Sequence, residues 1–174
     1  MITINPTQNY TPTEVTQFIQ QADKPLANYH NPIDILKYLQ QKQHAYTIYN
    51  DNIFAGIFAL NYTQNTWHPD SYLTTTYILP EHRRHGISKT LKSTATLALR
   101  NQGYDTGMII RETNTISRKA TEKSFNVTPS ASVVVDGVKL SYYLITLSEI
   151  EVSVDNQQLS RVFSNISDTF IKAL

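Results

Sequence analysis

The fold of this chain is decided by one stretch, Leu79-Pro80-Glu81-His82-Arg83-Arg84-His85-Gly86-Ile87-Ser88. A run rich in Tyr and Thr before it predicts a strand over Ser71–Leu79, and the apolar spacing after it predicts a helix over Gly86–Gln102. Pro80 ends the strand, and Gly86 lets the backbone come close to a ligand. Because unpaired N–H groups at the start of a helix attract negative charge, the stretch predicts an anion site. An ordinary strand-to-helix turn is the alternative.

Positive charge gathers around the same stretch. Residues 81–123 carry nine Lys and Arg against four Asp and Glu, a net charge of +5, whereas the rest of the chain carries −4. A local positive field in a nearly neutral protein suits a compact polyanion better than a nucleic acid, which usually needs a broad basic face. A solvated helix surface with no ligand would show the same imbalance.

Further helices and strands are predicted on both sides of this stretch. Caps, apolar spacing and turn residues predict helices over 11–22, 31–39, 114–125 and 159–170, and strands over 46–50, 53–62, 106–111, 132–135 and 138–147. We therefore expect an α+β fold with a mixed, mostly antiparallel central sheet flanked by helices. Residues 1–149 would form the main domain, and residues 150–174 would add an amphipathic helix that packs on it or on a dimer partner.

Composition excludes several classes of protein. A chain of 174 residues, 40% of them hydrophobic, suits one compact domain. With no cysteine it has no disulfide framework, thiolate nucleophile or cysteine-built zinc site. His82 and His85 are three residues apart but lack a third ligand at metal spacing, so we predict no metal. No apolar run is long enough to span a membrane, and residues 1–6 lack a basic region followed by a hydrophobic one, which predicts a cytoplasmic protein.

The chain resembles the GNAT superfamily of acyl-coenzyme A-dependent N-acyltransferases. The signature of that family is a hydrophobic strand, a proline, and Arg/Gln-X-X-Gly-X-Gly/Ala at the mouth of a helix. Residues 83–88, Arg-Arg-His-Gly-Ile-Ser, match it, with Ser88 in place of the last Gly or Ala. Residues 114–117, Asn-Thr-Ile-Ser, look like the second cofactor segment of the family, and the Asp136-Gly137 hairpin fits its last two strands.

The resemblance implies a sheet that opens like a V and acetyl-coenzyme A as co-substrate. Main-chain amides of residues 84–89 would bind the diphosphate, Ile78 and Leu79 would pair through their main chain with pantetheine, and Asn114 and Ser117 would line the thiol end. The cofactor-binding residues that it implies are Ile78, Leu79, Arg83, Arg84, His85, Gly86, Ile87, Ser88, Lys89, Asn114 and Ser117.

The usual proton carriers of the family are missing. Thr121 stands where many members have a catalytic tyrosine, and Tyr72 stands where others have a glutamate base. The candidates that replace them are Tyr142 or Tyr143 as acid and Asp70 or His68 as base. We take Tyr72, Asp70 and Tyr142 as the catalytic set, although tyrosines on strands often serve only packing. Positioning of the amine beside the thioester could supply much of the rate enhancement without a dedicated base.

The expected function is transfer of an acetyl group from acetyl-coenzyme A to a primary amine by direct attack in a ternary complex. The acidity outside residues 81–123 favours a cationic acceptor, such as a polyamine, an aminosugar or a lysine side chain of a protein. We expect no nucleic acid or membrane partner, and either a monomer or a homodimer. The alternatives are a non-catalytic acyl-coenzyme A sensor and a protein-interaction module on the same scaffold.

Overall fold

The computed structural model describes residues 1–6, 12–21, 44–146 and 157–166. The predicted helix over 31–39, the end of the last strand and the boundary at residue 149 lie outside these residues. The strands are β1 (Ile2–Pro6), β2 (His44–Asn50), β3 (Ile53–Asn65), β4 (His68–Ile78), β5 (Asp105–Arg111), β6 (Ala131–Val135) and β7 (Val138–Leu144). The helices are α1 (Pro12–Gln21), α3 (Ile87–Arg100), α4 (Thr115–Phe125) and α5 (Gln157–Ser164), with a 3-10 turn, η2, at Pro80–His82.

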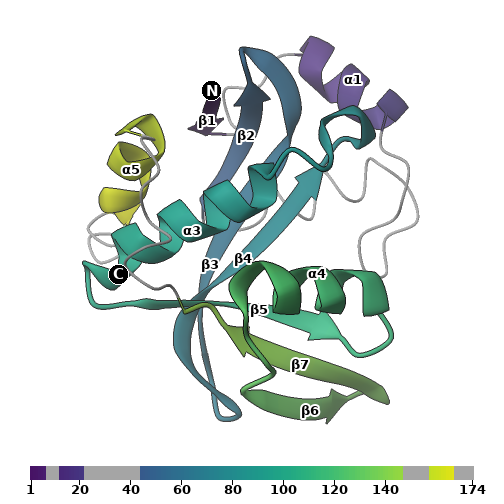
Figure 1. The fold of residues 1–174 in the computed structure, drawn as a ribbon, viewed down its shortest axis with the longest axis vertical. Helices are drawn as coiled ribbons and strands as arrows, with labels where there is room; N and C mark the ends of the chain where they lie inside the picture. The colour runs from purple at the N-terminus through teal and green to yellow at the C-terminus, as the bar shows by residue number, and fades with distance from the viewer. Residues whose placement is uncertain (7–11, 22–43, 147–156, 167–174) are drawn as a thin grey trace.

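The seven strands form one sheet in the order β1-β2-β3-β4-β5-β7-β6. The pairing of β4 with β5 is parallel, and every other neighbouring pair in the described sheet is antiparallel. Figure 1 shows α3 and α4 lying across the sheet, with α3 over β4 and α4 over β5 and β7. The prediction of an α+β fold with a mixed, mostly antiparallel sheet is confirmed.

Apolar side chains cover both faces of the sheet. On one face, α3 and α5 pack on the β1–β4 half through buried side chains that include Leu91 and Phe163. On the other face, Phe18 of α1 packs against Tyr77, with ring centroids 5.3 Å apart. Phe125 of α4 packs on β5 and β7 beside Met108. The first cluster includes Ile87 and Leu99, so it places both ends of α3 on the sheet.

The sequence analysis missed β1 and misplaced the turn between β3 and β4. The alternation in Ile2-Thr3-Ile4 was the signal for β1, and Ile4 is buried where β1 pairs with β2. The break left between the strands predicted over 53–62 and 71–79 is shorter, because β3 continues to Asn65 through an irregularity in its register and β4 begins at His68. His68 and Asp70 therefore lie in β4 and not between the two predicted strands.

A glycine on β3 allows the end of β4 to approach closely. Gly56 has a positive φ of 154° and lies opposite Ile78 in the register of the two strands. A Cβ atom at Gly56 would lie 2.1 Å from the carbonyl oxygen of Tyr77. Any larger residue would push β4 away at the point where the chain leaves the sheet for α3. Gly56 thus helps to position residues 79–88, which connect β4 to α3.

Candidate active site

The sheet opens where β4 and β5 part. Their parallel pairing ends at Leu73 opposite Gly107. Beyond this point β4 stays paired with β3 as far as Ile78, while β5 stays paired with β7 as far as Arg111. The two strands therefore diverge and form the V-shaped opening that the family resemblance implied.

The turn between β4 and α3 leaves a row of main-chain N–H groups without internal acceptors. Arg84 and Gly86 have φ angles of 67° and 73°, and Gly86 is the N-cap of α3. The first hydrogen bond of the helix runs from the N–H of Thr90 to the carbonyl of Gly86 at 2.9 Å. In the part of the chain that the structure describes, the N–H groups from Arg84 to Lys89 donate to no carbonyl. Since the row lies at the positive end of a helix dipole, it can bind an anion.

A groove of about 440 Å³ lies beside this row, between the end of β4 and the helices α3 and α4. Seven of the eleven residues predicted to bind the cofactor line it: Ile78, Arg83, Arg84, Gly86, Ile87, Ser88 and Lys89. The lining residues that the prediction omitted are Thr76, Tyr77, His82, Ala120 and Ser124. Ala120 and Ser124 could have been found from the sequence, because they continue the face of α4 that begins at Ser117 with helical spacing.

The open edge of β4 is formed by alternate residues. The N–H of Leu79 donates to the carbonyl of Ala55 at 2.8 Å, and the carbonyl of Leu79 accepts from the N–H of His82 at 2.9 Å. Both main-chain groups of Leu79 are therefore used inside the protein, and their pairing with pantetheine stays a prediction. Because alternate residues direct their main-chain groups to opposite sides of a strand, Thr76 and Ile78 face the opening.

Two arginine contacts hold the turn against β4. The Nε of Arg83 donates to the carbonyl of Ile78 at 2.9 Å, and the guanidinium carbon lies 5.6 Å from the centroid of the Tyr77 ring. A positive charge is thereby held at the groove by a hydrogen bond and a cation–π contact. The carbonyl of Ile78 becomes available to a ligand only if Arg83 releases it.

The remaining predicted cofactor residues lie outside the groove lining. His85 is exposed at the turn, and Asn114 is the N-cap of α4. The side chain of Asn114 accepts a hydrogen bond from the N–H of Ser117 at 3.2 Å. This bond is what a helix cap requires, so it accounts for the Asn and its spacing without a ligand. A role for Asn114 and Ser117 at the thiol end stays a prediction.

Tyr72 is buried in an aromatic cluster beneath α3. Its ring centroid lies 5.3 Å from that of Tyr62 and 5.4 Å from that of Tyr104. Its hydroxyl is buried and has no hydrogen-bond partner among the described residues. Burial and then the two neighbouring tyrosines raise the pKa of Tyr72 to about 12. Tyr72 therefore keeps its proton at neutral pH, cannot act as a base, and does not line the groove.

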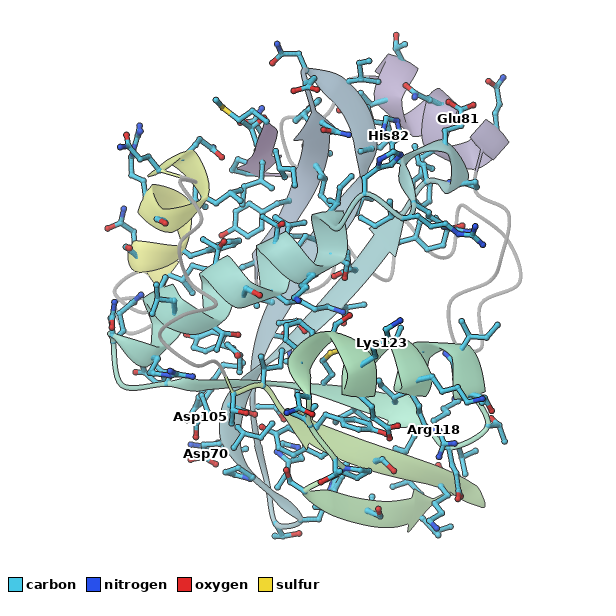
Figure 2. The ribbon with its side chains drawn as sticks, in the orientation of Figure 1. Asp70, Glu81, His82, Asp105, Arg118 and Lys123 are labelled. Carbon is cyan, nitrogen blue, oxygen red and sulfur yellow. The ribbon has the colours of Figure 1, made fainter. Side chains whose placement is uncertain are left out.

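Asp70 and Tyr142 belong to the closed end of the sheet. Asp70 is exposed and lies eight residues before Ile78, about 26 Å away along an extended strand. Figure 2 shows Asp70 near Asp105 at that end, far from His82 on the turn. Tyr142 is buried, and its hydroxyl lies 3.0 Å from the Oγ of Ser71, to which it donates. The structure thus does not bring the predicted catalytic set together.

The ring of Tyr142 lies against Gly107 of β5 at the closed end of the sheet. It stacks on the ring of His68 with centroids 4.7 Å apart and an interplanar angle of 12°. A Cβ atom at Gly107 would lie 2.4 Å from this ring, so β5 needs glycine there. Burial raises the pKa of Tyr142, whereas the hydrogen bond with Ser71 acts in the opposite direction. These contacts make Tyr142 a packing residue in the described structure.

Two other positions singled out by sequence meet where α4 packs on β7: Thr121 is on the helix and Tyr143 is on the strand. The hydroxyl of Tyr143 donates to Oε1 of Glu122 at 2.9 Å, and burial followed by this bond raises the pKa of Tyr143 to about 12. Thr121 is buried, with its hydroxyl 3.8 Å from the sulfur of Met108. Neither side chain lines the groove. The place of the usual catalytic tyrosine is therefore taken by a core residue.

Sequence reasoning missed a buried lysine on α3. Lys92 is 9% exposed, and burial lowers the pKa of its ammonium from 10.5 to about 8. It follows Ser88, which lines the groove, by one helical turn on the same face. An isolated lysine on a helix is usually exposed, so the residue type does not indicate burial. The spacing from Ser88 was the sequence signal that could have indicated it.

The comparisons with known proteins fit this geometry. The profile of the Acetyltransferase (GNAT) family matches residues 11–126, more than half of the chain. The chain therefore belongs to the GNAT acetyltransferase family. The match begins before the motifs quoted above and ends before the β6–β7 hairpin. No curated protein matches the sequence.

Solved structures share the fold at low sequence identity. A chimera of spermidine N-acetyltransferase SpeG from Vibrio cholerae and hSSAT is 12% identical over 83% of this chain and 94% of its own, with a TM-score of 0.57. YncA from Salmonella typhimurium, solved with acetyl-coenzyme A, is 14% identical over 90% of this chain and 98% of its own, with a TM-score of 0.53. Arabidopsis thaliana Naa50, in complex with the bisubstrate analogue CoA-Ac-MVNAL, is 11% identical over 84% of this chain and 99% of its own, with a TM-score of 0.53. None of the helices among the described residues is long and apolar enough to cross a membrane.

We expect the substitution Lys92→Met to stabilise the protein at neutral pH. Below pH 8 the folded state must bury the ammonium, and a pKa lowered from 10.5 to about 8 corresponds to about 3 kcal/mol. Between pH 8 and 10.5 the folded lysine loses its proton before the unfolded one does, so the stability of the wild type rises with pH. The advantage of the variant should therefore shrink over this range. Urea unfolding at pH 7 and pH 10 measures the difference in the free energy of unfolding between the variant and the wild type.

Lys89→Met is the matched control, because Lys89 is exposed on the same helix. Its stability should stay within about 0.5 kcal/mol of the wild type at both pH values. A Lys92→Met protein that is less stable than the wild type by the same amount at pH 7 and pH 10 would contradict a pKa of Lys92 that burial lowers.

Proposed function

We propose that the protein is an N-acetyltransferase that moves an acetyl group from acetyl-coenzyme A to a primary amine. The observation that carries this proposal is the row of unpaired N–H groups from Arg84 to Lys89, which lies beside the V-shaped opening of the sheet. A diphosphate on this row would accept hydrogen bonds from the main chain and face the positive end of α3. Arg83, Arg84 and Lys89 add positive charge around it.

The pantetheine arm would enter the V between β4 and β5. Thr76 offers it main-chain groups at the open edge of β4, and Ile78 offers its N–H. Ala120 and Ser124 are small enough to leave room for it along α4. The thioester would then lie toward the closed end, where Leu73 and Gly107 make the last sheet pairing.

In the reaction, the nitrogen of a neutral amine attacks the thioester carbonyl, the C–S bond breaks, and the products are the acetamide and coenzyme A thiol. The protein contributes first by placing the two reactants in one orientation, which can be worth several orders of magnitude. The amine must also lose a proton and the sulfur must gain one. In our proposal Tyr72 and Tyr142 do not carry these protons, because both hydroxyls are buried outside the groove.

The acceptor in this proposal is a cationic primary amine, such as a polyamine or a peptide amine. Asp70 and Asp105 lie near one another at the closed end of the sheet (Figure 2) and would attract such a cation. The similar structures include proteins named for a polyamine acceptor and one in complex with a peptide bisubstrate analogue, so both classes belong in the test.

A sensor that binds acyl-coenzyme A without turnover is the second candidate. It is favoured by Thr121, which packs against Met108 at the position where many family members carry the proton donor. Such a protein would keep the groove and the N–H row, but it would not catalyse acetyl transfer.

Incubation with acetyl-coenzyme A and a panel of amines tests the first candidate. The panel contains polyamines, aminosugars, amino acids, lysine peptides and peptides with free N-termini. We expect release of coenzyme A thiol with at least one class and an increase in melting temperature with the cofactor alone. Stabilisation with background turnover on every amine would support the sensor. Absence of stabilisation at saturating acetyl-coenzyme A would overturn both.

Gly86→Glu should abolish binding of coenzyme A. A carboxylate beside the N–H row repels the diphosphate, and like charges in contact cost several kcal/mol, so Kd should rise by about 100-fold or more. Gly103→Glu is the control, because Gly103 also has a positive φ and open space for a Cβ atom but follows the other end of α3. Both variants carry similar backbone strain. Calorimetric titration should give wild-type affinity for Gly103→Glu, and equal losses in both variants would contradict the site.

A further inference from the structure

Four buried side-chain polar atoms have no hydrogen-bond partner among the described residues. They are His44 Nε2, the Tyr72 hydroxyl, Thr76 Oγ1 and Arg118 Nε. Thr76 is the member of this set that lines the groove beside the N–H row. Because a buried hydroxyl without a partner lowers the stability of a protein, an unpaired hydroxyl in a binding groove points to a partner that the ligand supplies.

The side chain of Thr76 lies on the face of the sheet that α3 covers. The register between β3 and β4 is regular along this part of β4, so alternate residues share a face. Tyr72 and Ile78, which lie an even number of residues away, both pack in the cluster under α3. Tyr77 belongs to the opposite face, where its ring contacts Phe18. Thr76 thus presents its side chain on the side where α3 and α4 enclose the groove.

The preceding threonine on the same face shows why Thr76 lacks a partner. The hydroxyl of Thr74 donates to the carbonyl oxygen of Gly107 on β5 at 3.4 Å, one residue beyond the last pairing of β4 with β5. Thr76 follows by two residues, which is about 7 Å along an extended strand, and β5 has diverged there. A ligand in the V takes the place of β5. It can therefore offer Thr76 a carbonyl, as Gly107 offers one to Thr74.

We propose that the hydroxyl of Thr76 donates a hydrogen bond to an amide carbonyl of the pantetheine arm, and that it selects a ligand with such an arm. This inference rests on the proposed function. The arm carries amide groups along a flexible chain, and an amide carbonyl is the same acceptor that Thr74 uses on β5. A rotation to another staggered position about the Cα–Cβ bond of Thr76 directs the hydroxyl toward the groove without moving the backbone.

The competing partner for this hydroxyl is the diphosphate. The N–H row from Arg84 to Lys89 already offers that anion its donors at the mouth of the groove. Thr76 lies about 7 Å further along β4 than Ile78, whose carbonyl accepts from Arg83 beside the turn. The two partners differ in what a substitution changes. Loss of a diphosphate contact weakens the binding of every nucleotide with a diphosphate, whereas loss of an arm contact weakens the binding of coenzyme A alone.

The test is calorimetric titration of the full chain with coenzyme A and with adenosine 3′-phosphate 5′-diphosphate, which keeps the diphosphate and lacks the arm. Thr76→Val removes the hydroxyl and keeps the shape of the side chain. A hydrogen bond of ordinary strength is worth about 3- to 10-fold in affinity, so the Kd for coenzyme A should rise by that factor while the Kd for the nucleotide changes less than about twofold. The melting temperature of the free variant should not fall, because the free protein loses no hydrogen bond.

Thr76→Ser keeps the hydroxyl and should bind coenzyme A within about twofold of the wild type. Thr75→Val is the matched control, because Thr75 is the adjacent residue of β4, is half-buried and lies outside the groove lining. It should leave both Kd values unchanged. An unchanged Kd for coenzyme A in Thr76→Val would overturn the proposal, and so would equal losses for both probes or an equal loss in Thr75→Val. Failure of the wild type to bind coenzyme A would instead overturn the proposed function on which the inference rests.

Discussion

The early end of the pairing between β4 and β5 is the constraint on which the rest of the site depends. A sheet that stayed paired past Leu73 and Gly107 would use the main-chain groups of both strands internally and leave no edge for a ligand. Because β4 is held by β3 and β5 by β7, each edge stays extended after they part. Gly56 brings the end of β4 close to β3, and the chain then turns through η2 into α3.

Positive charge in this molecule is concentrated on α3 and at its N-terminal end. The N-terminal end of α3 offers N–H groups without acceptors, its rim offers Arg84 and Lys89, and its buried face offers Lys92. Each of these features lowers the stability of the free protein or leaves it unchanged, because unpaired donors and buried cations gain nothing from the fold itself. Features of this kind are expected where folding stability is given up for binding and catalysis.

Most of the fold could be predicted from sequence because its signals are local. Turn residues such as Asp136-Gly137 and the Pro80 boundary mark the elements, and the spacing of Arg83 and Gly86 marks the anion site. The proton carriers could not be predicted, because burial is decided by packing between distant elements. The sequence does not reveal that Tyr72 faces Tyr62 and Tyr104, that Tyr142 bonds with Ser71, or that Lys92 is enclosed.

The most direct test of the account is the amide chemical shift of each residue as coenzyme A is added, recorded by nitrogen-15 NMR. A diphosphate bound by the main chain should move the amide signals of Arg84 to Lys89 downfield, with smaller changes at Thr76 and Ile78 and none at Gly103 or the β6–β7 turn. If coenzyme A binds while the signals from Arg84 to Lys89 stay in place, the anion is held elsewhere, and the account of this site is contradicted.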